Sequence, residues 1–210
     1  IPAVLVEQEA CCGMPKLELG DLEAVGKLKE KNLPPLVKLA REGYAILTPV
    51  PSCTLMFKQE LPLMFPEDAD LKAVSEAMWD PFEYLALRNA DGLLKKDFKQ
   101  SLGKVSYHVP CHLRVQNIGP RTRDLLQLVP DTKVHMVERC SGHDGTWGVK
   151  SEYFEMSMKI GKPVFKQMAQ TDPDYVSSDC PIAGRHILQG MGTDTAKQHP
   201  ISLLRIAYGL

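Results

Sequence analysis

Apolar runs of strand length recur along this chain, and each is followed by a glycine-containing loop and a segment of helical periodicity. The first run covers residues 3–8 and the second covers residues 133–138. Apolar side chains then recur at helical spacing over about 21–32 and about 149–160. The same order of strand, loop and helix in two places predicts an internal repeat.

Prolines follow both predicted helices at matching places. Pro34 and Pro35 follow the first helical segment, and Pro163 follows the second. Proline has no amide hydrogen for the helical ladder, yet it suits the first turn of a new helix. The prolines therefore predict a break in each helix and a second short helix over about 35–42 and 163–170.

A second apolar run closes each repeat and leads to a cysteine. Residues 44–48 precede Cys53, and residues 175–178 precede Cys180. Two strands joined by a helix are typical of a βαβ unit, in which the strands are parallel and the crossover is right-handed. The second repeat has a further strand-like run over 104–109. We therefore predict an α/β fold of two pseudo-twofold-related βαβ halves, with parallel sheets and cysteines at the carboxyl ends of the strands.

A helical segment separates the two repeats. The sequence thus predicts a first half over residues 1–65, a helical connection over 66–102 and a second half over 103–210. Within the connection, Asp80 and Pro81 form a typical helix start, because aspartate caps the first free amides and proline fits the first turn.

The composition is that of an ordinary globular chain, and it excludes several classes of protein. The 210 residues are 44% hydrophobic and 24% charged, and the formal net charge is −1. The basic excess typical of nucleic-acid-binding proteins is absent, and so are a membrane-spanning apolar run and a secretory signal. We therefore predict a cytoplasmic protein. The chain starts at Ile1 and Pro2 without an initiator methionine, which predicts a fragment of a longer polypeptide or a processed chain.

Cysteine and nearby histidine side chains carry the candidate chemistry. The six cysteines are Cys11, Cys12, Cys53, Cys111, Cys140 and Cys180. A long chain with no secretory signal favours metal or redox chemistry over a disulfide framework. Thiols at strand ends would converge at a sheet edge, where helix N-termini stabilise thiolates. His112 and His143 lie within three positions of a cysteine and are further candidate ligands.

The sequence pattern leaves the identity of the metal open. The adjacent Cys11 and Cys12 favour an iron–sulfur cluster over a single zinc ion, because neighbouring thiolates can bind different irons. A zinc site of three cysteines and one histidine could be formed from the same kinds of residue.

The cysteine motifs resemble the duplicated cysteine-rich CCG domain family. The resemblance rests on Cys-Cys-Gly-Met-Pro at 11–15, on Ser-Cys at 52–53, and on the segments 107–112, 139–142 and 178–181. This domain occurs in heterodisulfide reductases and in the iron–sulfur subunits of anaerobic glycerol-3-phosphate dehydrogenase and glycolate oxidase.

The resemblance implies a [4Fe–4S] cluster-binding electron-transfer module with no substrate chemistry of its own. It implies a flavin-containing dehydrogenase subunit and a ferredoxin-like module as partners, and a quinone or a thiol/disulfide as acceptor. It also implies peripheral association with the inner face of the membrane through a complex.

The chain departs from the fuller family motif, which has five thiolates in each half. Ser141 stands in place of a paired cysteine, and Met56 and Ala183 stand where a Cys-x-x-Cys motif would end. The second half therefore offers three cysteines, for a cluster with an open iron or for zinc completed by His112 or His143. The leading cysteine of the first half would precede Ile1.

Two other function classes fit the same residues. One is a zinc-binding structural or assembly module. The other is a thiol–disulfide reductase in which either Cys11 and Cys12 or an open iron of a cluster reacts with the disulfide. Among the remaining histidines, the pattern predicts structural roles for His108 and His135 within strands. His199 is predicted to cap the last helix.

Overall fold

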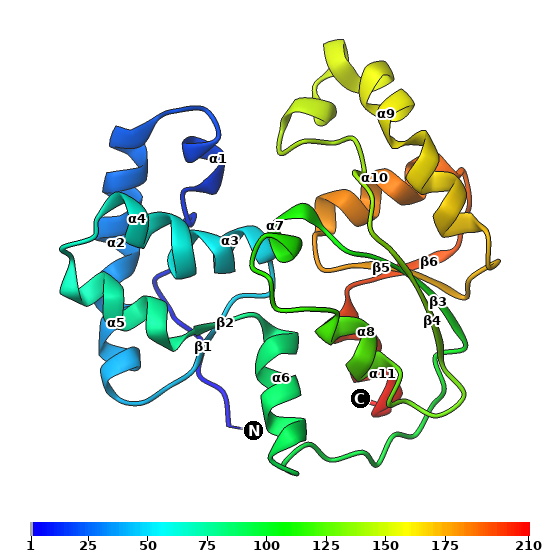
Figure 1. The fold of residues 1–210 in the computed structure, drawn as a ribbon, viewed down its shortest axis with the longest axis horizontal. Helices are drawn as coiled ribbons and strands as arrows, with labels where there is room; N and C mark the ends of the chain where they lie inside the picture. The colour runs from blue at the N-terminus through cyan, green and yellow to red at the C-terminus, as the bar shows by residue number, and fades with distance from the viewer. Residues whose placement is uncertain (1) are drawn as a thin grey trace. The chain divides into compact units, whose positions relative to one another are not determined.

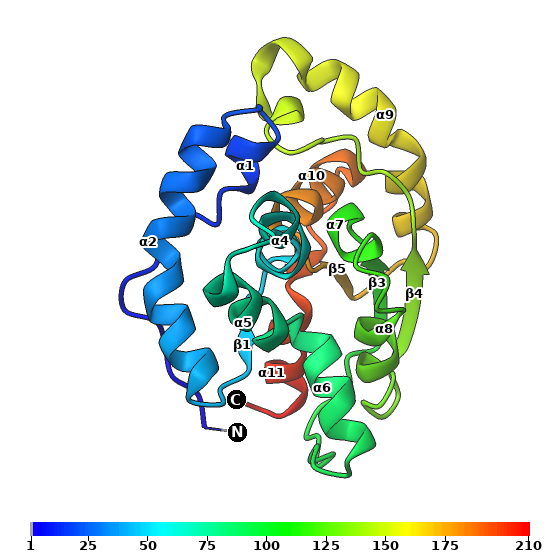
Figure 2. The ribbon, with the colours of Figure 1, turned by 60° about the vertical axis from the view of Figure 1, so that its left-hand side comes forward.

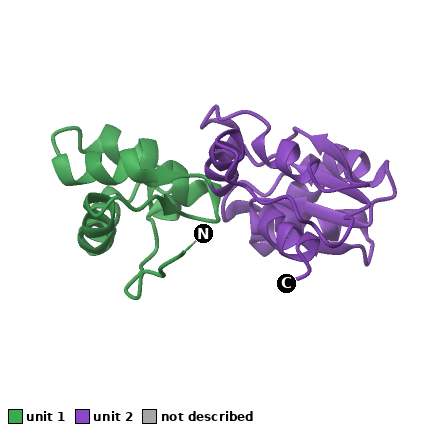
Figure 3. Ribbon diagram, turned by 90° about the horizontal axis from the view of Figure 1, so that it is seen from below, with its two compact units in different colours: residues 1–80 green, residues 81–210 purple. Residues whose placement is uncertain are grey.

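The computed structural model describes residues 2–210, which form an α/β protein (Figure 1). The chain divides after Asp80 into unit 1, residues 1–80, and unit 2, residues 81–210 (Figure 3). Every strand pair in the described part of the chain is parallel. This confirms the predicted fold class. The three-part division predicted from the repeat stays a prediction.

Unit 1 is mainly helical and packs around one apolar core. Helix α2 (Leu22–Arg41) packs against α5 (Ala69–Ala77), and the two lie side by side in Figure 2. The other elements are α1 (Met14–Leu17), β1 (Ile46–Leu47), α3 (Pro51–Leu55), the π-helical η1 (Met56–Glu60), α4 (Leu61–Met64) and β2 (Met78–Trp79). Strands β1 and β2 pair with each other.

The predicted strand over residues 3–8 is wrong. No regular structure is assigned to this segment, and the side chains of Val4 and Leu5 are 59% and 88% exposed. A strand needs a neighbour to satisfy its backbone amides and carbonyls, and no strand among the described residues pairs with this segment.

The predicted proline breaks are also wrong. Helix α2 continues through Pro34 and Pro35, and α9 (Ser151–Ala169) continues through Pro163. Each proline deprives the carbonyl four residues earlier of its helical partner. Those carbonyls belong to residues 30, 31 and 159, which are all exposed, so water can satisfy them. Solvent exposure therefore lets both helices run on.

Unit 2 is built on a parallel four-stranded sheet. Its strands are β3 (Lys104–His108), β4 (Lys133–Val137), β5 (Tyr175–Ser178) and β6 (Ala196–Gln198). Its helices are α6 (Pro81–Ala90), α7 (Cys111–Arg114), α8 (Arg121–Leu126), the 3-10 helix η2 (Trp147–Val149), α9, α10 (Pro181–Met191) and α11 (Pro200–Ala207). The predicted strands at 104–109, 133–138 and 175–178 are confirmed within one residue. The predicted helix start at Pro81 is confirmed too.

Helices cover both faces of this sheet (Figure 1). One apolar cluster joins Val105 and Tyr107 of β3 to Leu126 of α8 and Leu203 of α11. A second cluster joins β4 and β5 to α9 and α10 on the other face. Alternate residues of a strand face opposite sides, so Ser106 and His108 point towards the α9 and α10 layer.

The strand order of the sheet determines where a ligand would bind. The order is β4-β3-β5-β6, so the chain passes from β3 to one neighbour and then crosses to the other side of β3. In open α/β sheets this reversal creates a crevice at the carboxyl ends of the strands. In this sheet the reversal falls between β3 and β5, so the rule predicts ligand binding near their carboxyl ends.

No helix within residues 2–210 is both long enough and apolar enough to cross a lipid bilayer.

Candidate metal centre

The three cysteines of unit 1 share one cavity. Cys11, Cys12 and Cys53 line a space of about 440 Å³ together with residues 9, 10, 15 and 52. The two adjacent cysteines precede α1, while Cys53 lies in the first turns of α3. Cys11 is exposed, Cys12 is buried and Cys53 is half-buried. The fold therefore brings together sulfurs that lie 42 positions apart in sequence.

Two of these sulfurs interact directly. A hydrogen bond with Cys53 and burial both raise the pKa of the Cys12 thiol. The same bond lowers the pKa of Cys53. Cys12 is therefore the proton donor and Cys53 takes the thiolate form first. A thiolate beside a thiol is suited to binding a soft metal, and also to thiol–disulfide exchange.

A buried asparagine holds the backbone of the cysteine pair. Asn32 of α2 is 5% exposed, and its Nδ2 donates to the carbonyl oxygens of Cys11 at 3.0 Å and Leu28 at 2.9 Å. Its Oδ1 accepts from the amide of Ala10 at 2.9 Å. Only the amide of asparagine or glutamine can donate and accept in this way. Sequence reasoning missed this residue, because nothing in the local pattern distinguishes it from other polar helix residues.

The substitution Asn32→Asp is expected to destabilise unit 1 by about 2–4 kcal/mol. A carboxylate can still accept from Ala10, but it cannot donate to the two carbonyls, and it would be a buried charge. Urea denaturation of the metal-free chain measures the change. The matched control is Asn117→Asp, an exposed position whose left-handed backbone also suits aspartate. Equal stability of the two variants would contradict the role of Asn32.

The three cysteines of unit 2 follow the ends of three adjacent strands. Cys111 begins α7 after β3, Cys140 follows β4, and Cys180 caps α10 after β5. Burial raises the pKa of Cys111, and the charges of Cys140 and Cys180 raise it further. Burial also raises the pKa of Cys180, although amides at the start of α10 oppose this effect. Gathering three thiolates here is unfavourable unless a cationic centre compensates their charge.

The Cys140 loop lies directly against helix α9. The hydroxyl of Ser157 donates to the carbonyl of Gly142 at 2.8 Å, and His186 of α10 lies 3.0 Å from the same hydroxyl. The Gly142 amide donates to the sulfur of Cys140 at 3.4 Å. Helices α9 and α10 thus fix the turn that presents the sulfur.

The two candidate histidine ligands are placed differently. His143 Nδ1 lies 2.6 Å from the hydroxyl of Ser141, and burial lowers its pKa to about 4. His112 lies in α7 next to Cys111, close enough to His143 for their charges to interact. No three cysteine, histidine or acidic side chains within residues 2–210 are arranged to hold a single metal ion.

The cysteine chemistry fits an iron–sulfur cluster. A single zinc ion needs its thiolates within about 4 Å of one another, whereas cluster thiolates bind different irons and can lie further apart. Three soft thiolates in each unit match the donor type that clusters require.

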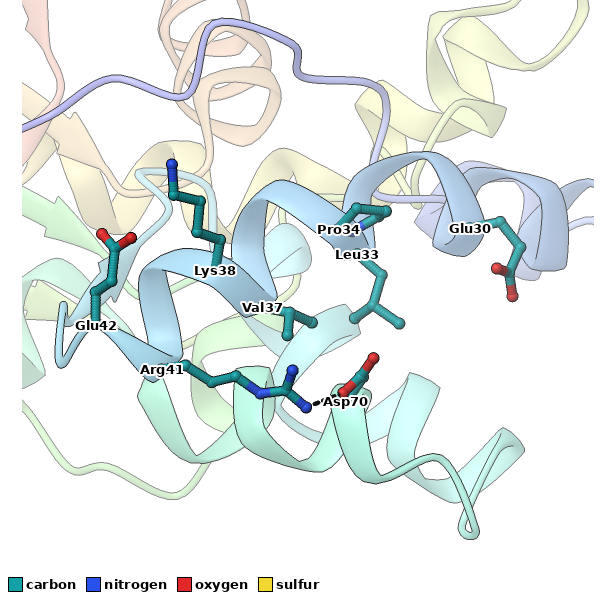
Figure 4. A pocket seen from close by; sticks show the side chains of 8 residues that line it. All are labelled: Glu30, Leu33, Pro34, Val37, Lys38, Arg41, Glu42 and Asp70. Atoms are coloured by element: carbon teal, nitrogen blue, oxygen red, sulfur yellow. Dashed lines mark hydrogen bonds and ion pairs between the residues drawn. The ribbon is translucent and has the colours of Figure 1, made fainter.

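A second cavity in unit 1 contains no cysteine. It measures about 610 Å³ and is lined by residues 30, 33, 34, 37, 38, 41, 42 and 70. Figure 4 shows Arg41 and Asp70 forming an ion pair beside the apolar side chains of Leu33 and Val37. Arg41 and Asp70 are thus engaged with each other, and the cavity adds no group to the cysteine centres.

The buried His108 predicts a pH dependence of stability. Burial lowers its pKa from 6.5 to about 4. Between pH ~6.5 and pH ~4, this histidine is protonated in the unfolded chain but neutral in the folded chain. The free energy of unfolding therefore decreases as the pH falls through this window. Asp179 acts in the opposite direction, since burial raises its pKa to about 6.

A variant comparison isolates the contribution of His108. Between pH 7 and 4.5, metal-free wild type is expected to lose about 2–3 kcal/mol more stability than His108→Gln, which has no proton to gain. Denaturant titrations at the two pH values measure the difference. Parallel pH profiles of the two proteins would contradict the neutral buried state of His108.

Comparison with known proteins identifies the family. The cysteine-rich (CCG) domain matches residues 2–58 and 105–186, which include all six cysteines. The chain belongs to this family. Two separate ranges of the chain match the same domain, so the resemblance to the duplicated CCG domain family is confirmed.

Relatives of this CCG protein are oxidoreductase subunits and iron–sulfur proteins. It is 28% identical to a subunit of the anaerobic glycerol-3-phosphate dehydrogenase of Escherichia coli, covering 95% of this chain and 50% of the relative. It is 27% identical to a subunit of the dihydromethanophenazine:CoB–CoM heterodisulfide reductase of Methanosarcina mazei, covering 99% and 52%. An iron–sulfur protein of Methanococcus maripaludis is 28% identical, covering 95% and 37%.

The chain spans about half or less of the length of these relatives. Together, the family and the relatives support iron–sulfur cluster binding in an oxidoreductase context.

Proposed function

We propose that this protein is an iron–sulfur electron-transfer module of an oxidoreductase complex. The observation that carries the proposal is the placement of Cys111, Cys140 and Cys180 after the ends of β3, β4 and β5. These strand ends form the ligand-binding edge of a doubly wound sheet. The interaction of Cys111 with the charges of both other thiolates supports their convergence.

Each unit would hold one cluster through its own cysteines. Cys111, Cys140 and Cys180 are the proposed ligands in unit 2. Cys11, Cys12 and Cys53 are the proposed ligands in unit 1, where they share a cavity. His112 and His143 stay proposed ligands or proton acceptors beside the unit 2 site.

A bound cluster would accept and release electrons one at a time. The chain itself supplies thiolates, helix N-terminal amides and partly buried surroundings. The proposed donor is a flavin-containing dehydrogenase subunit, with a ferredoxin-like module in the same complex. The proposed acceptor is a quinone or a disulfide, in a cytoplasmic complex associated with the inner face of the membrane.

Anaerobic purification of the chain tests cluster binding. We expect iron and acid-labile sulfide in equal amounts, broad visible absorbance, and a paramagnetic signal after reduction. Reoxidation of the reduced protein by a water-soluble quinone, compared with a small disulfide, tests the class of acceptor. Stoichiometric zinc in a colourless protein would contradict the proposal and support the structural zinc module instead.

Thiol–disulfide reduction is a second candidate, favoured by the hydrogen-bonded pair Cys12 and Cys53. Attack of Cys53 on a disulfide would release one thiol and form a mixed disulfide. Attack by Cys12 would then release the second thiol and leave a Cys12–Cys53 disulfide. Iron-free protein should show this stoichiometric reduction, and Cys53→Ser should abolish it. Equal reaction of the variant and the wild type would exclude this function.

A further inference from the structure

One histidine lies between the strand ends that carry the unit 2 cysteines. His108 is the last residue of β3, the strand that separates β4 from β5. Its backbone is in register with Val137 of β4 and Ser178 of β5. Its side chain is 1% exposed. The imidazole therefore lies between the two neighbouring strand ends, within reach of both.

Both ring nitrogens of His108 make hydrogen bonds to these strand ends. Nε2 lies 2.8 Å from the carbonyl oxygen of Arg139, the residue before Cys140. Nδ1 lies 3.2 Å from the hydroxyl of Ser178. That hydroxyl oxygen also lies 3.4 Å from the amide of Cys180. One side chain thus connects the backbones that lead into two cysteines, and its own strand leads to the third.

The chemistry of the partners fixes the direction of each bond. A carbonyl oxygen only accepts, so Nε2 must carry the proton and donate to Arg139. In the neutral ring Nδ1 is then an acceptor, and Ser178 donates its hydroxyl hydrogen to it. The hydroxyl oxygen is left to accept from the Cys180 amide. Burial favours the neutral ring that this arrangement requires.

The bonds extend the sheet beyond its own backbone ladder. The last ladder bond between β3 and the β4 segment joins the amide of Val109 to the carbonyl of Val137, at 3.0 Å. Arg139 lies two residues further along the chain. Its carbonyl oxygen accepts a hydrogen bond from the His108 side chain instead of from a backbone amide. An aliphatic side chain of similar size could fill the core, but it could not hold the Arg139 carbonyl or the Ser178 hydroxyl.

We propose that His108 is the positioning residue of the unit 2 cysteine triad, fixing the approach of Cys140 and the amide of Cys180 relative to Cys111. The proposal rests on the proposed function only for the cluster itself, because the arrangement of the thiols can be measured without metal. It differs from the purely structural role expected for a histidine in a strand.

The metal-free test uses phenylarsine oxide, which binds two neighbouring thiols with loss of one water. Cys11, Cys12 and Cys53 are replaced with serine in the full chain, so that only the unit 2 thiols respond. We expect His108→Leu to weaken binding of the arsenical at least tenfold. His108→Gln, which retains a donor for the Arg139 carbonyl, should recover most of the affinity.

His135→Gln is the matched control. This histidine lies on β4, and its Nε2 has no hydrogen-bond partner within residues 2–210. Its substitution should leave the arsenical affinity within twofold of the parent. If His108→Leu fails to fold, Ser178→Ala removes only the link to Cys180 and should weaken binding by several fold.

Reconstituted protein gives the second readout. This test uses the chain with all six cysteines intact. The variant His108→Leu should have an altered paramagnetic spectrum, and a chelator should remove its unit 2 signal faster than that of the parent. His108→Gln should restore both properties. A folded His108→Leu protein with parent arsenical affinity would overturn the positioning role. A wild type that binds no iron, but whose variants show the expected arsenical series, would instead refute only the proposed function.

Discussion

Replacing Gly142 with alanine is expected to destabilise unit 2 by about 3–5 kcal/mol. Gly142 has φ +88°, where a side chain is strained. A Cβ atom there would also lie 2.4 Å from the carbonyl oxygen of Ser157 and 2.8 Å from the amide nitrogen of Gly161. Both atoms belong to the backbone of α9, so relief requires the Cys140 loop to move away from the helix. The same movement would displace the sulfur of Cys140.

The control for this prediction is Gly192→Ala. Gly192 has a comparable left-handed φ of +62°, but no atom within 4 Å of the position its Cβ would occupy. Its substitution should cost about 1–2 kcal/mol, the strain alone. Trp147 lies in unit 2 and stacks on Tyr153, so its fluorescence reports unfolding of that unit when Trp79 is replaced with phenylalanine. Equal losses in the two variants would contradict the close approach of loop and helix.

The sequence predicts β3, β4 and β5 of unit 2 well because each contains the β-branched or aromatic side chains that favour strands. In the structure all three pair with a neighbouring strand. The run at residues 3–8 has the same composition without a paired strand, and there the prediction fails. Hydrophobicity identifies a segment that can pair, but pairing also depends on a neighbour that the local sequence does not specify.

Helix α9 shows a second limit of periodicity. Its regular apolar spacing includes Tyr153, Met156 and Ile160, and these side chains are 40–54% exposed. The buried residues in this part of the helix are instead Ser157 and Gly161. The Cys140 loop approaches that face so closely that only small residues fit. Close packing against the Cys140 loop therefore determines which face of the helix is buried, and the apolar periodicity does not predict it.

The cysteines of the candidate site are predictable, whereas the residues that hold them are not. Cysteine is rare and reactive, so six of them in a repeated context stand out. His108 is predicted as a core residue, and its burial fits that prediction. Its partners Arg139 and Ser178, however, are 31 and 70 positions away. Only the parallel strand order brings such groups into contact, and local sequence does not encode that order.

Replacing Cys140 with serine is expected to remove the cluster of unit 2 and lower the iron content by about four atoms per chain. Serine has a similar volume, but its hydroxyl is a hard donor that stays protonated where a thiol ionises. Cys111→Ser and Cys180→Ser should have the same effect, because three thiolates leave no ligand to spare. Iron and sulfide analysis of anaerobically purified variants measures the loss, and denaturation of metal-free protein should show changes of less than ~1 kcal/mol.

The corresponding change in unit 1 provides the control and assigns each cluster to its unit. Cys53→Ser should remove iron from unit 1 alone, and the combination with Cys140→Ser should remove all of it. Additive losses are expected because the two proposed sites share no ligand, and distant, independent sites behave additively. If Cys140→Ser retained the wild-type iron content while Cys53→Ser lost all of it, the cluster would belong to unit 1 only. The sulfurs of unit 2 would then be ordinary thiols at a strand edge, and His108 would position no ligand.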